Sequence, residues 1–481
     1  MKSPPSTVLW TPNGGRLTAQ EQRSGRITRR TFIKAGAATA LTAASWARVY
    51  GANERIGVGM IGFGLIGRIH TRNFKAQPDV NIVGLAEVYQ PRLEAAAQLV
   101  GGKVAEYRDF RRLLDNKDVD AVVISTADHW HALMTMMACA AGKDAYVEKP
   151  LTLFVREGRW MTDVARRYNR VVQVGTQQRS GLHYQKARQM IQTGYLGDIV
   201  AVQVKYYRNL MPGFGNPPDQ NPPPELDWEM MLGPAPYRPY NPNRGIYHFR
   251  WFWDYSGGQM TNLGHHSLDI VHWFMNVDGP TAVTSTGGRF FLKDNCEVPD
   301  TQDAIIEYPK FVANVEYREC TSMPQDTGMG GLVFYGTKGS MVLSRDGYEV
   351  IPSPKRNPMN IVAAIIGGHP VGGPQPVPEP KGKQLWTEPD KAEGDWQELY
   401  VLHVRNFLDC IKSRKTPLSD VQSGHQIATA CHLTNISLKT GRKIRWDAKT
   451  EQIIDDPEAA RMLVRQYRSP WDQQLRSLNV T

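Results

Sequence analysis

Short apolar runs alternate with helix-periodic stretches between residues 55 and 176. The runs are rich in Val, Ile and Ala and end in glycine or polar residues, which is typical of strands buried on both faces of a parallel sheet. We therefore expect a doubly wound α/β domain here. Its expected strands are 56–61, 81–87, 104–107, 119–125, 144–148 and 171–175, and its expected helices include 91–100, 129–142 and 151–168.

From residue 199 the pattern changes to alternation of apolar and polar positions. Alternation is typical of a sheet with one exposed face, so the sequence predicts a second, α+β domain with a mainly antiparallel open sheet. Residues 352–395, rich in proline, glycine and lysine, are expected to form a long surface excursion. The expected strands are 199–207, 281–291, 302–309, 312–319, 331–336 and 339–350, and the expected helices are 264–275, 396–413 and 419–439.

Residues 1–47 have the three-part build of an export signal. A polar, basic start leads to Thr28-Arg29-Arg30-Thr31-Phe32-Ile33-Lys34 and then to an apolar stretch rich in Ala and Thr. The paired arginines predict a twin-arginine signal, so we expect a periplasmic or otherwise exported protein that stays membrane-anchored if the signal is not cleaved. The basic start of a cytoplasmic protein is the alternative. The domain prediction is a signal over 1–47, a doubly wound domain over 54–176, an α+β domain over 177–445 and an extension over 446–481.

The net charge of the chain depends on this leader. The whole chain has 57 Lys and Arg against 47 Asp and Glu, but seven of the basic residues and one acid lie in residues 1–47, which leaves +4 for the remainder. A value so close to zero gives no support for a nucleic-acid partner. A chain that is 41% hydrophobic and 22% charged has the composition of a globular protein.

A glycine motif follows the first expected strand. In G-x-G-x-x-G the first glycine permits a tight turn, the second lets the backbone approach a pyrophosphate, and the third packs the next helix on the sheet. The phosphates would lie at the helix N-terminus, where free N–H groups favour anions. The motif predicts a tightly bound dinucleotide, and its residues are Gly62, Phe63, Gly64, Leu65, Ile66 and Gly67.

The second expected strand ends in an acid, Glu87, twenty residues after Gly67. An acid at this place meets the hydroxyls of the adenosine ribose. Its charge favours NAD over NADP, whereas Arg68 and Arg92 leave NADP open. We include Arg92 among the cofactor-binding residues.

Candidate catalytic groups follow the ends of the next strands. Ser125 and Thr126 are small enough to let a nicotinamide ribose approach, and we include them, with His129 and His131 shortly after them, among the cofactor-binding residues. For the two histidines a structural role is the equally supported alternative. Glu148-Lys149-Pro150 closes the fifth strand. Because ligands of open α/β sheets bind outside the carboxyl ends of the strands, Lys149 should face the cofactor and a substrate hydroxyl. A solvated charge is the alternative for Lys149.

The densest set of candidate substrate groups lies between residues 247 and 272. Aromatic rings interleaved with charges are typical of sugar-binding pockets, and an apolar core is the alternative. The candidate substrate residues are Arg250, Trp253, Asp254, Tyr255, Asn262 and His265.

Metal and disulfide chemistry have little support. His265, Asp269 and His272 share a helix face, but no E-x-x-H or H-E-x-x-H arrangement accompanies them, so no metal is expected. The five cysteines show no zinc spacing, and we expect mostly buried free thiols, with Cys296–Cys320 as the one pair to check.

On these motifs the chain resembles the Gfo/Idh/MocA family of sugar and inositol dehydrogenases over about residues 54–445. The resemblance rests on the glycine motif, on Glu148-Lys149-Pro150 and on Gly264-x-His266-x-x-Asp269. It implies that Lys149 and His266 are the catalytic pair, that Asp269 supports them, and that the open sheet forms a homo-oligomer contact. The family's D-x-G-x-H-x-x-D begins with Asn262 here, and an amide cannot act as a base.

Three functions are compatible with these features. The first is NAD(P)-dependent hydride transfer at a secondary alcohol of a sugar, polyol or glycoside. The second is a redox-neutral glycosidase or lyase with a 3-keto intermediate, which the export signal favours because exported members of the family include NAD-dependent glycosidases. The third is a non-catalytic carbohydrate-binding protein with structural NAD, for which Asn262 is the only support. In each case the expected partners are a small carbohydrate and the twin-arginine export machinery.

Overall fold

The structure is a computed structural model that describes residues 55–321, 331–356, 358–368, 372 and 384–480. These residues belong to one unit, Arg55–Thr481, and the predicted signal over 1–47 lies outside the described residues. No helix in the described part of the chain combines the length and apolar character that a membrane span requires.

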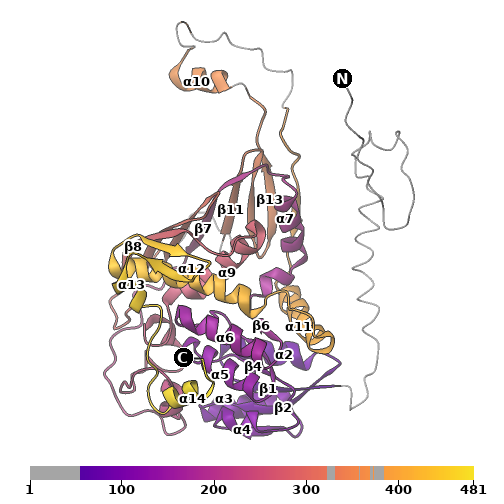
Figure 1. The fold of residues 1–481 in the computed structure, drawn as a ribbon, viewed down its shortest axis with the longest axis vertical. Helices are drawn as coiled ribbons and strands as arrows, with labels where there is room; N and C mark the ends of the chain where they lie inside the picture. Colours follow the sequence, from indigo (N-terminus) through magenta and orange to yellow (C-terminus); the bar gives the residue numbers. More distant parts are fainter. Residues whose placement is uncertain (1–54, 322–330, 357, 369–371, 373–383, 481) are drawn as a thin grey trace, which may run out of the picture. The chain divides into compact units, whose positions relative to one another are not determined.

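The apolar runs of the first half form a six-stranded parallel sheet in the order β3-β2-β1-β4-β5-β6 (Figure 1). Every residue of β1, β4 and β5 is buried, which confirms that continuous apolar runs here mark strands covered on both faces. The strands are β1 Ile56–Ile61, β2 Val80–Ala86, β3 Ala105–Tyr107, β4 Ala121–Ile124, β5 Asp144–Val147 and β6 Val172–Val174.

Helices cover this sheet on two sides. Side chains of α4, α5 and α6 form one core cluster, and side chains of α2, α3 and the much later α11 form another. The helix expected over 151–168 begins only at Val155, because the carboxylate of Glu157 accepts the N–H groups of Leu153 and Phe154. The helices are α2 Leu65–Lys75, α3 Gln90–Val100, α4 Phe110–Leu114, α5 Asp128–Ala140, α6 Val155–Arg167 and α11 Trp396–Ser413.

The second half forms a ten-stranded sheet in the order β14-β13-β12-β11-β7-β10-β9-β8-β15-β16, in which β7 and β10 are parallel and the other pairs antiparallel. The predicted open, mainly antiparallel sheet is confirmed. The run 339–350 is two strands and not one, because it turns back at Arg345 and Asp346. The strands are β7 Ile199–Tyr207, β8 Ala282–Gly288, β9 Thr301–Glu307, β10 Val312–Arg318, β11 Gly331–Gly336, β12 Gly339–Ser344, β13 Gly347–Pro352, β14 Lys391–Glu393, β15 Ile444–Asp447 and β16 Gln452–Ile454.

Two long helices, α9 Gly258–Met275 and α12 Val421–Thr440, lie between the two sheets (Figure 1). They pack against each other, and α12 also contacts α6 and β8. α9 begins six residues before the expected residue 264, because Met260 and Thr261 are buried and extend the helix toward Lys149. The remaining helical elements are η4 Gln177–Ser180, α7 Leu182–Gln192, α8 Trp228–Leu232, η5 His248–Trp251, α10 Pro358–Ile366, α13 Pro457–Arg461 and α14 Trp471–Ser477.

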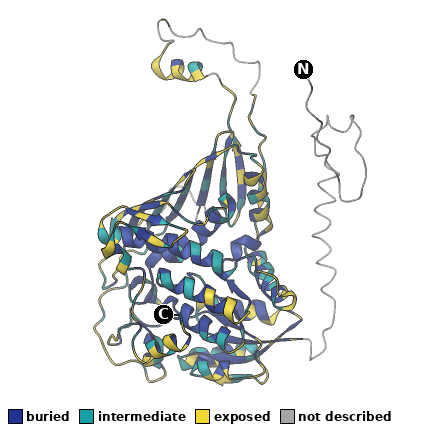
Figure 2. Ribbon diagram, in the orientation of Figure 1, coloured by how far each residue is buried: buried dark blue, intermediate teal, exposed yellow. Residues whose placement is uncertain are grey.

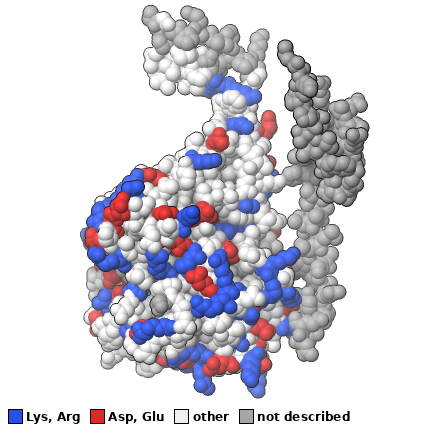
Figure 3. All heavy atoms as spheres, viewed as in Figure 1, with Lys and Arg blue, Asp and Glu red and all other residues white. Residues whose placement is uncertain are grey.

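The expected surface excursion carries α10, whose residues are exposed except for the buried Ala363 and the half-buried Met359 and Asn360 (Figure 2). On the face drawn in Figure 3, basic and acidic side chains are interspersed over the rest of the unit. The C-terminal segment leaves the ten-stranded sheet and reaches the first domain, where Trp471 packs edge-on against Trp130 with ring centroids 4.7 Å apart.

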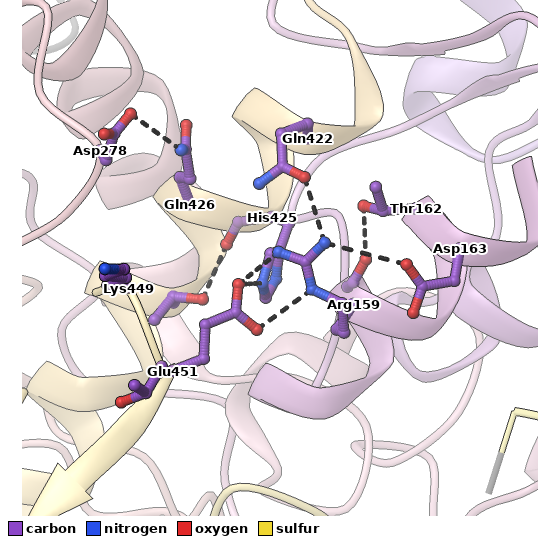
Figure 4. A network of polar contacts seen from close by, with 12 residues as sticks. Arg159, Thr162, Asp163, Asp278, Gln422, His425, Gln426, Lys449 and Glu451 are labelled. Carbon is purple, nitrogen blue, oxygen red and sulfur yellow. Dashed lines mark hydrogen bonds and ion pairs between the residues drawn. The ribbon is translucent and has the colours of Figure 1, made fainter. Parts of the chain in front are cut away.

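A polar network joins the turn between β15 and β16 to α6 and α12 (Figure 4). Glu451, between β15 and β16, accepts from Arg159 of α6, and its Oε1 lies 2.9 Å from His425 Nε2 of α12. Burial alone would raise the pKa of Glu451, but the hydrogen bonds of His425 and Arg159 hold it at about 2, below the 4.5 of a free side chain.

We expect Glu451→Gln to lower the unfolding temperature at pH 7 by about 2 °C, the scale of one lost charged hydrogen bond in a large domain. Because the pKa of Glu451 is lower in the folded state, its stabilisation is complete above pH 4.5 and is lost as the pH falls toward 2. The difference in unfolding free energy between wild type and Glu451→Gln, measured with urea, should therefore become smaller as the pH falls from 4.5 toward 2.

The matched control is Asp455→Asn, since the pair of Asp455 with Arg445 lies on the same hairpin but is exposed. We expect no change in its unfolding temperature. Equal unfolding temperatures for wild type and Glu451→Gln at pH 7 would contradict the role of the network.

Candidate active site

The glycine loop between β1 and α2 has the geometry of a phosphate cradle. Gly62 has φ +87°, and a Cβ on it would lie 2.7 Å from the carbonyl oxygen of Ser125. A Cβ on Gly67 would lie 2.3 Å from the carbonyl oxygen of Gly62, so both positions require glycine. A Cβ on Gly64 would meet only Arg92 Nη1, at 3.7 Å. Gly64 therefore presents open backbone at the start of α2, as a bound pyrophosphate requires.

A cavity of about 800 Å³ opens beside this loop. The carboxyl ends of β1, β2 and β4 form one wall, and residues 246–250 form the other. The predicted residues that line it are Gly62, Gly64, Leu65, Ile66, Glu87, Arg92, Ser125, Thr126 and Arg250. The hydroxyl of Ser125 is buried there without a hydrogen-bond partner among the described residues, so a polar ligand atom can use it. The residues present fit a dinucleotide.

Glu87 has a second task besides lining the cavity. Its Oε2 accepts the N–H of Phe63 at 2.7 Å, and its Oε1 accepts the N–H of Tyr89 at 3.1 Å. The acid expected to meet a ribose therefore also fixes the glycine loop, while each oxygen keeps a lone pair for a hydroxyl. Phe63 itself is buried and, like Gly67, supports the loop from behind.

The two histidines after β4 do not line the cavity, and both are held by carbonyl oxygens of the chain. Their role as cofactor ligands stays a prediction. His129 Nε2 lies 3.0 Å from the carbonyl oxygen of Met231, and burial lowers the pKa of His129 to about 3. His131 Nδ1 lies 2.7 Å from the carbonyl oxygen of Pro150 and its Nε2 lies 3.2 Å from that of Thr126. His131 thereby joins the segments that follow β4 and β5, and so helps to place Lys149.

Lys149 reaches from the end of β5 to α9. Its Nζ donates to Asn262 Oδ1 at 2.7 Å and to the Asn262 carbonyl oxygen at 3.2 Å. Burial lowers the pKa of Lys149 to about 8, Glu148 counteracts this, and the charges of Arg250 and Arg345 lower it further. The lysine is therefore paired with α9 and is not a solvated charge.

Glu148 supports the lysine without facing the cavity. Its Oε1 lies 2.6 Å from His70 Nε2, and its Oε2 accepts the N–H of Lys149 at 3.1 Å. Burial alone would raise the pKa of Glu148, but the His70 hydrogen bond and the nearby positive charges hold it below its usual value. Glu148 is thus a charged anchor between α2 and β5.

The residues of the α9 motif are buried in the structure. Burial and then the charge of Lys149 hold the pKa of His266 well below its usual value, so this histidine is neutral at pH 7. Both Asp269 oxygens accept from Arg179 Nε, at 2.9 and 3.0 Å, so the structure shows a pair with Arg179, and support of His266 stays a prediction. His265 is fully buried with neither ring nitrogen partnered among the described residues, and its role as a substrate residue stays a prediction.

Most of the substrate candidates in the aromatic segment do not line the cofactor cavity. Asp254 pairs with Arg238 at 2.8 Å, and Tyr255 is buried against the ring of His129. Trp253 lines a separate cavity beside Lys439, whose Nζ lies 3.8 Å above its ring. Of the four aromatic-segment candidates, only Arg250 lines the cofactor cavity.

Several site residues could not be found from sequence motifs. His70 carried a signal only in its position three residues after Gly67, on the inner face of α2. Arg345 lies in the β12–β13 turn, far away in sequence, where its guanidinium stacks on Trp396 at 4.6 Å. Gln259 and Glu319 belong to the same set. Gln259 and Glu319 are connected to Lys149 only in the folded chain, through Asn262.

No group of three or more His, Cys, Asp or Glu side chains suited to a metal occurs among the described residues. His272, which shares a helix face with His265, lies 2.8 Å from the Tyr308 hydroxyl. All five cysteines are free, so Cys296 and Cys320 are not joined.

Sequence comparisons match the two halves of the chain to one family. Residues 56–176 match the profile described as "Oxidoreductase family, NAD-binding Rossmann fold". Residues 180–286 and 399–473 match "Oxidoreductase family, C-terminal alpha/beta domain", and residues 235–342 match "GFO/IDH/MocA C-terminal domain".

Individual relatives are distant. The scyllo-inositol 2-dehydrogenase (NAD(+)) of Bacillus subtilis (strain 168) is 22% identical over 397 residues, which cover 81% of this chain and 96% of that protein. Glycosyl hydrolase family 109 protein 1 of Shewanella sp. (strain MR-4) is 28% identical over 165 residues, 33% of this chain and 36% of that protein.

A levoglucosan dehydrogenase solved in complex with NADH has the same fold, with a TM-score of 0.60 at 19% identity over 81% of this chain and 99% of that one. Together with the glycine cradle, the family profiles show that the chain belongs to the Gfo/Idh/MocA family of oxidoreductases and carries its NAD-binding Rossmann domain.

Proposed function

We propose that this protein oxidises a secondary alcohol of a sugar, polyol or glycoside by hydride transfer to NAD. The observation that carries the proposal is the position of Lys149, which follows β5 and contacts Asn262 of α9. Burial lowers its pKa to about 8, and the charge of Arg250, a residue that lines the cofactor cavity, contributes to this. A general acid–base group works best when its pKa lies near the operating pH. The dehydrogenases named above support a carbohydrate substrate.

The chain's own residues would hold the cofactor at its two ends. Gly62 and Gly64 would leave room for the pyrophosphate, and Glu87 would accept from ribose hydroxyls. When bound, NAD supplies the hydride acceptor. Arg92 next to Gly64 supplies positive charge to the phosphates, and the Glu87 carboxylate favours NAD over NADP.

Lys149 and His266 would divide the proton chemistry. The neutral amine of Lys149 accepts the proton of the substrate hydroxyl, because its pKa of about 8 leaves a useful fraction unprotonated near neutral pH. His266 is a poor proton acceptor, since its pKa lies well below the usual value, so it orients the hydroxyl through a hydrogen bond. Asn262 supplies an oxygen to the lysine and takes no proton.

A redox-neutral glycosidase or lyase is the second candidate, and the partial match to the glycosyl hydrolase of Shewanella favours it. In this reaction oxidation at C3 acidifies the C2 proton, elimination expels the leaving group, and reduction restores the alcohol. Loss of deuterium from C2-labelled glycoside would support this candidate. Retained label with accumulating ketone would support net oxidation. No observation on the described residues favours a non-catalytic binding protein.

Export and assembly complete the proposal. The pair Arg29-Arg30 supports export of the folded, NAD-loaded protein through the twin-arginine route, which cell fractionation of an Arg29→Lys/Arg30→Lys variant would test. Apolar side chains on exposed positions of the ten-stranded sheet, such as Val200, Ile305 and Ile351, support a homo-oligomer contact there, which light scattering would test.

Substitutions in the glycine loop should separate cofactor binding from folding. Gly64→Val places methyl groups where the structure leaves open space, so we expect at least a tenfold loss of NAD affinity with an unchanged unfolding temperature without NAD. Gly62→Ala, at φ +87° and against the Ser125 carbonyl oxygen, should lower both the NAD affinity and the unfolding temperature. Calorimetric titration and thermal unfolding measure the two effects. Normal NAD affinity in Gly64→Val would contradict the cradle.

Lys149→Met should lower kcat by at least about 100-fold while NAD still binds, because the proton acceptor is lost. In the wild type, oxidation should rise as the pH passes about 8, where Lys149 loses its proton, and the variant should lack this limb. Lys143→Met, at the other end of β5, is the control and should keep the limb. A variant of Lys149 with the wild-type pH profile would exclude it as the proton acceptor.

A further inference from the structure

A buried carboxylate that the proposed chemistry does not use lies near the site. Glu319 follows β10 and is 1% exposed. Its Oε2 accepts from Trp251 Nε1 at 2.7 Å, and its Oε1 accepts from Gln259 Nε2 at 2.7 Å and from Arg208. The indole N–H of Trp251 and the guanidinium of Arg208 can only donate, so both oxygens of Glu319 act as hydrogen-bond acceptors.

Two side-chain amides connect this carboxylate to the lysine. Gln259 donates its N–H to Glu319, and its Oε1 accepts from Asn262 Nδ2 at 3.1 Å. Asn262 in turn presents Oδ1 to Lys149 Nζ at 2.7 Å. Gln259 and Asn262, which we call the amide pair, thus link a buried anion to a buried cation without an ion pair between them.

The direction of each amide follows from the carboxylate. Because Glu319 accepts only, the NH2 group of Gln259 must face it, and the Gln259 oxygen must face Asn262. That oxygen requires the NH2 group of Asn262, so the Asn262 oxygen is the atom left for Lys149. If Asn262 were reversed, its NH2 group would meet the ammonium group, and two donors would face each other in a partly buried site.

We propose that Glu319 is a positioning residue, which acts through the amide pair to keep the oxygen of Asn262 on Lys149. An aspartate at position 262 would offer an oxygen in either orientation and would need no such support. The asparagine has one acceptor and needs a partner that fixes its orientation. The inference rests on the proposed function only for its effect on turnover, since the hydrogen bonds exist whatever the substrate is.

The predicted effect is on the titration of Lys149. An oxygen that accepts from the ammonium group stabilises the charged form, so losing that acceptor must lower the pKa. The other charged or titratable groups that act on Lys149 are Glu148 from β5, Asp128 from α5, Arg250 from η5, Arg345 from the β12–β13 turn, and His265 and His266 from α9. None of these is changed in the variants below.

The test is competitive acetylation of the full-length protein with acetic anhydride across pH, with Lys149 quantified by peptide mass spectrometry. Gln259→Leu removes the middle of the link and leaves Glu319 with Arg208 and Trp251, so the Lys149 midpoint should fall by at least about half a pH unit. Glu319→Gln should shift it in the same direction, because a neutral amide no longer forces the orientation of Gln259. Trp251→Phe removes the hydrogen bond to Glu319 Oε2, keeps an aromatic ring beside Arg208, and should leave the Lys149 midpoint unchanged.

The decisive comparison uses Asn262→Asp, which should raise the Lys149 midpoint and make it independent of Gln259→Leu and Glu319→Gln. If both variants shift the midpoint equally in the wild-type and Asn262→Asp backgrounds, the amide pair does not carry the effect. An unchanged midpoint in Gln259→Leu, or in Glu319→Gln, would likewise overturn the proposal. The acetylation readout needs no turnover, so the Lys149 midpoints remain informative even if the proposed substrate class is wrong. Conversely, if the amide pair does not act on Lys149, the expected loss of activity in Lys149→Met is unaffected.

Discussion

Lys149 lies where β5 ends, and its ammonium group is largely removed from water between the parallel sheet and α9. Keeping a positive charge there requires acceptors, and the surrounding elements provide them. Glu148, the preceding residue, is held by His70. Asn262 on α9 is held by Gln259, which in turn donates to Glu319. The result is a pKa near 8 that neither free lysine nor an unsupported buried lysine would have.

The buried positive charge of Lys149 also explains the protonation state of the neighbouring histidines. The positive charge of Lys149 adds to burial in holding His266 and His265 neutral, so these rings cannot compete for the proton. His131 lies between the carbonyl oxygens of Thr126 and Pro150 and ties together the segments that carry Ser125 and Lys149. Asp269 and Arg179 form a buried pair that secures η4 against α9. Several side chains that resemble catalytic groups in the sequence thus also join the elements around Lys149.

The local pattern predicted the fold well and the site only in part. Continuous apolar runs identified all six parallel strands, and glycine spacing identified the cradle, because both signals come from neighbouring residues. In the aromatic segment, Asp254 pairs with Arg238 and the ring of Trp253 packs against Lys439, which lies far along the chain. The predicted substrate contacts of these residues stay predictions. Glu319 lies 60 residues after Gln259, and no spacing rule connects them. Partners across such distances are set by tertiary packing alone.

If this chain moves a hydride from a carbohydrate carbon to NAD with Lys149 as the proton acceptor, the hydrogen of that carbon must appear on the nicotinamide ring. The most direct measurement is a single turnover of the full-length protein with sugars and polyols deuterated at their carbinol carbons, followed by mass spectrometry of the nicotinamide. The proposed hydride transfer predicts deuterium on the nicotinamide ring for the substrate, at a rate that rises as the pH passes about 8. Absence of label from every sugar and polyol tested would contradict it.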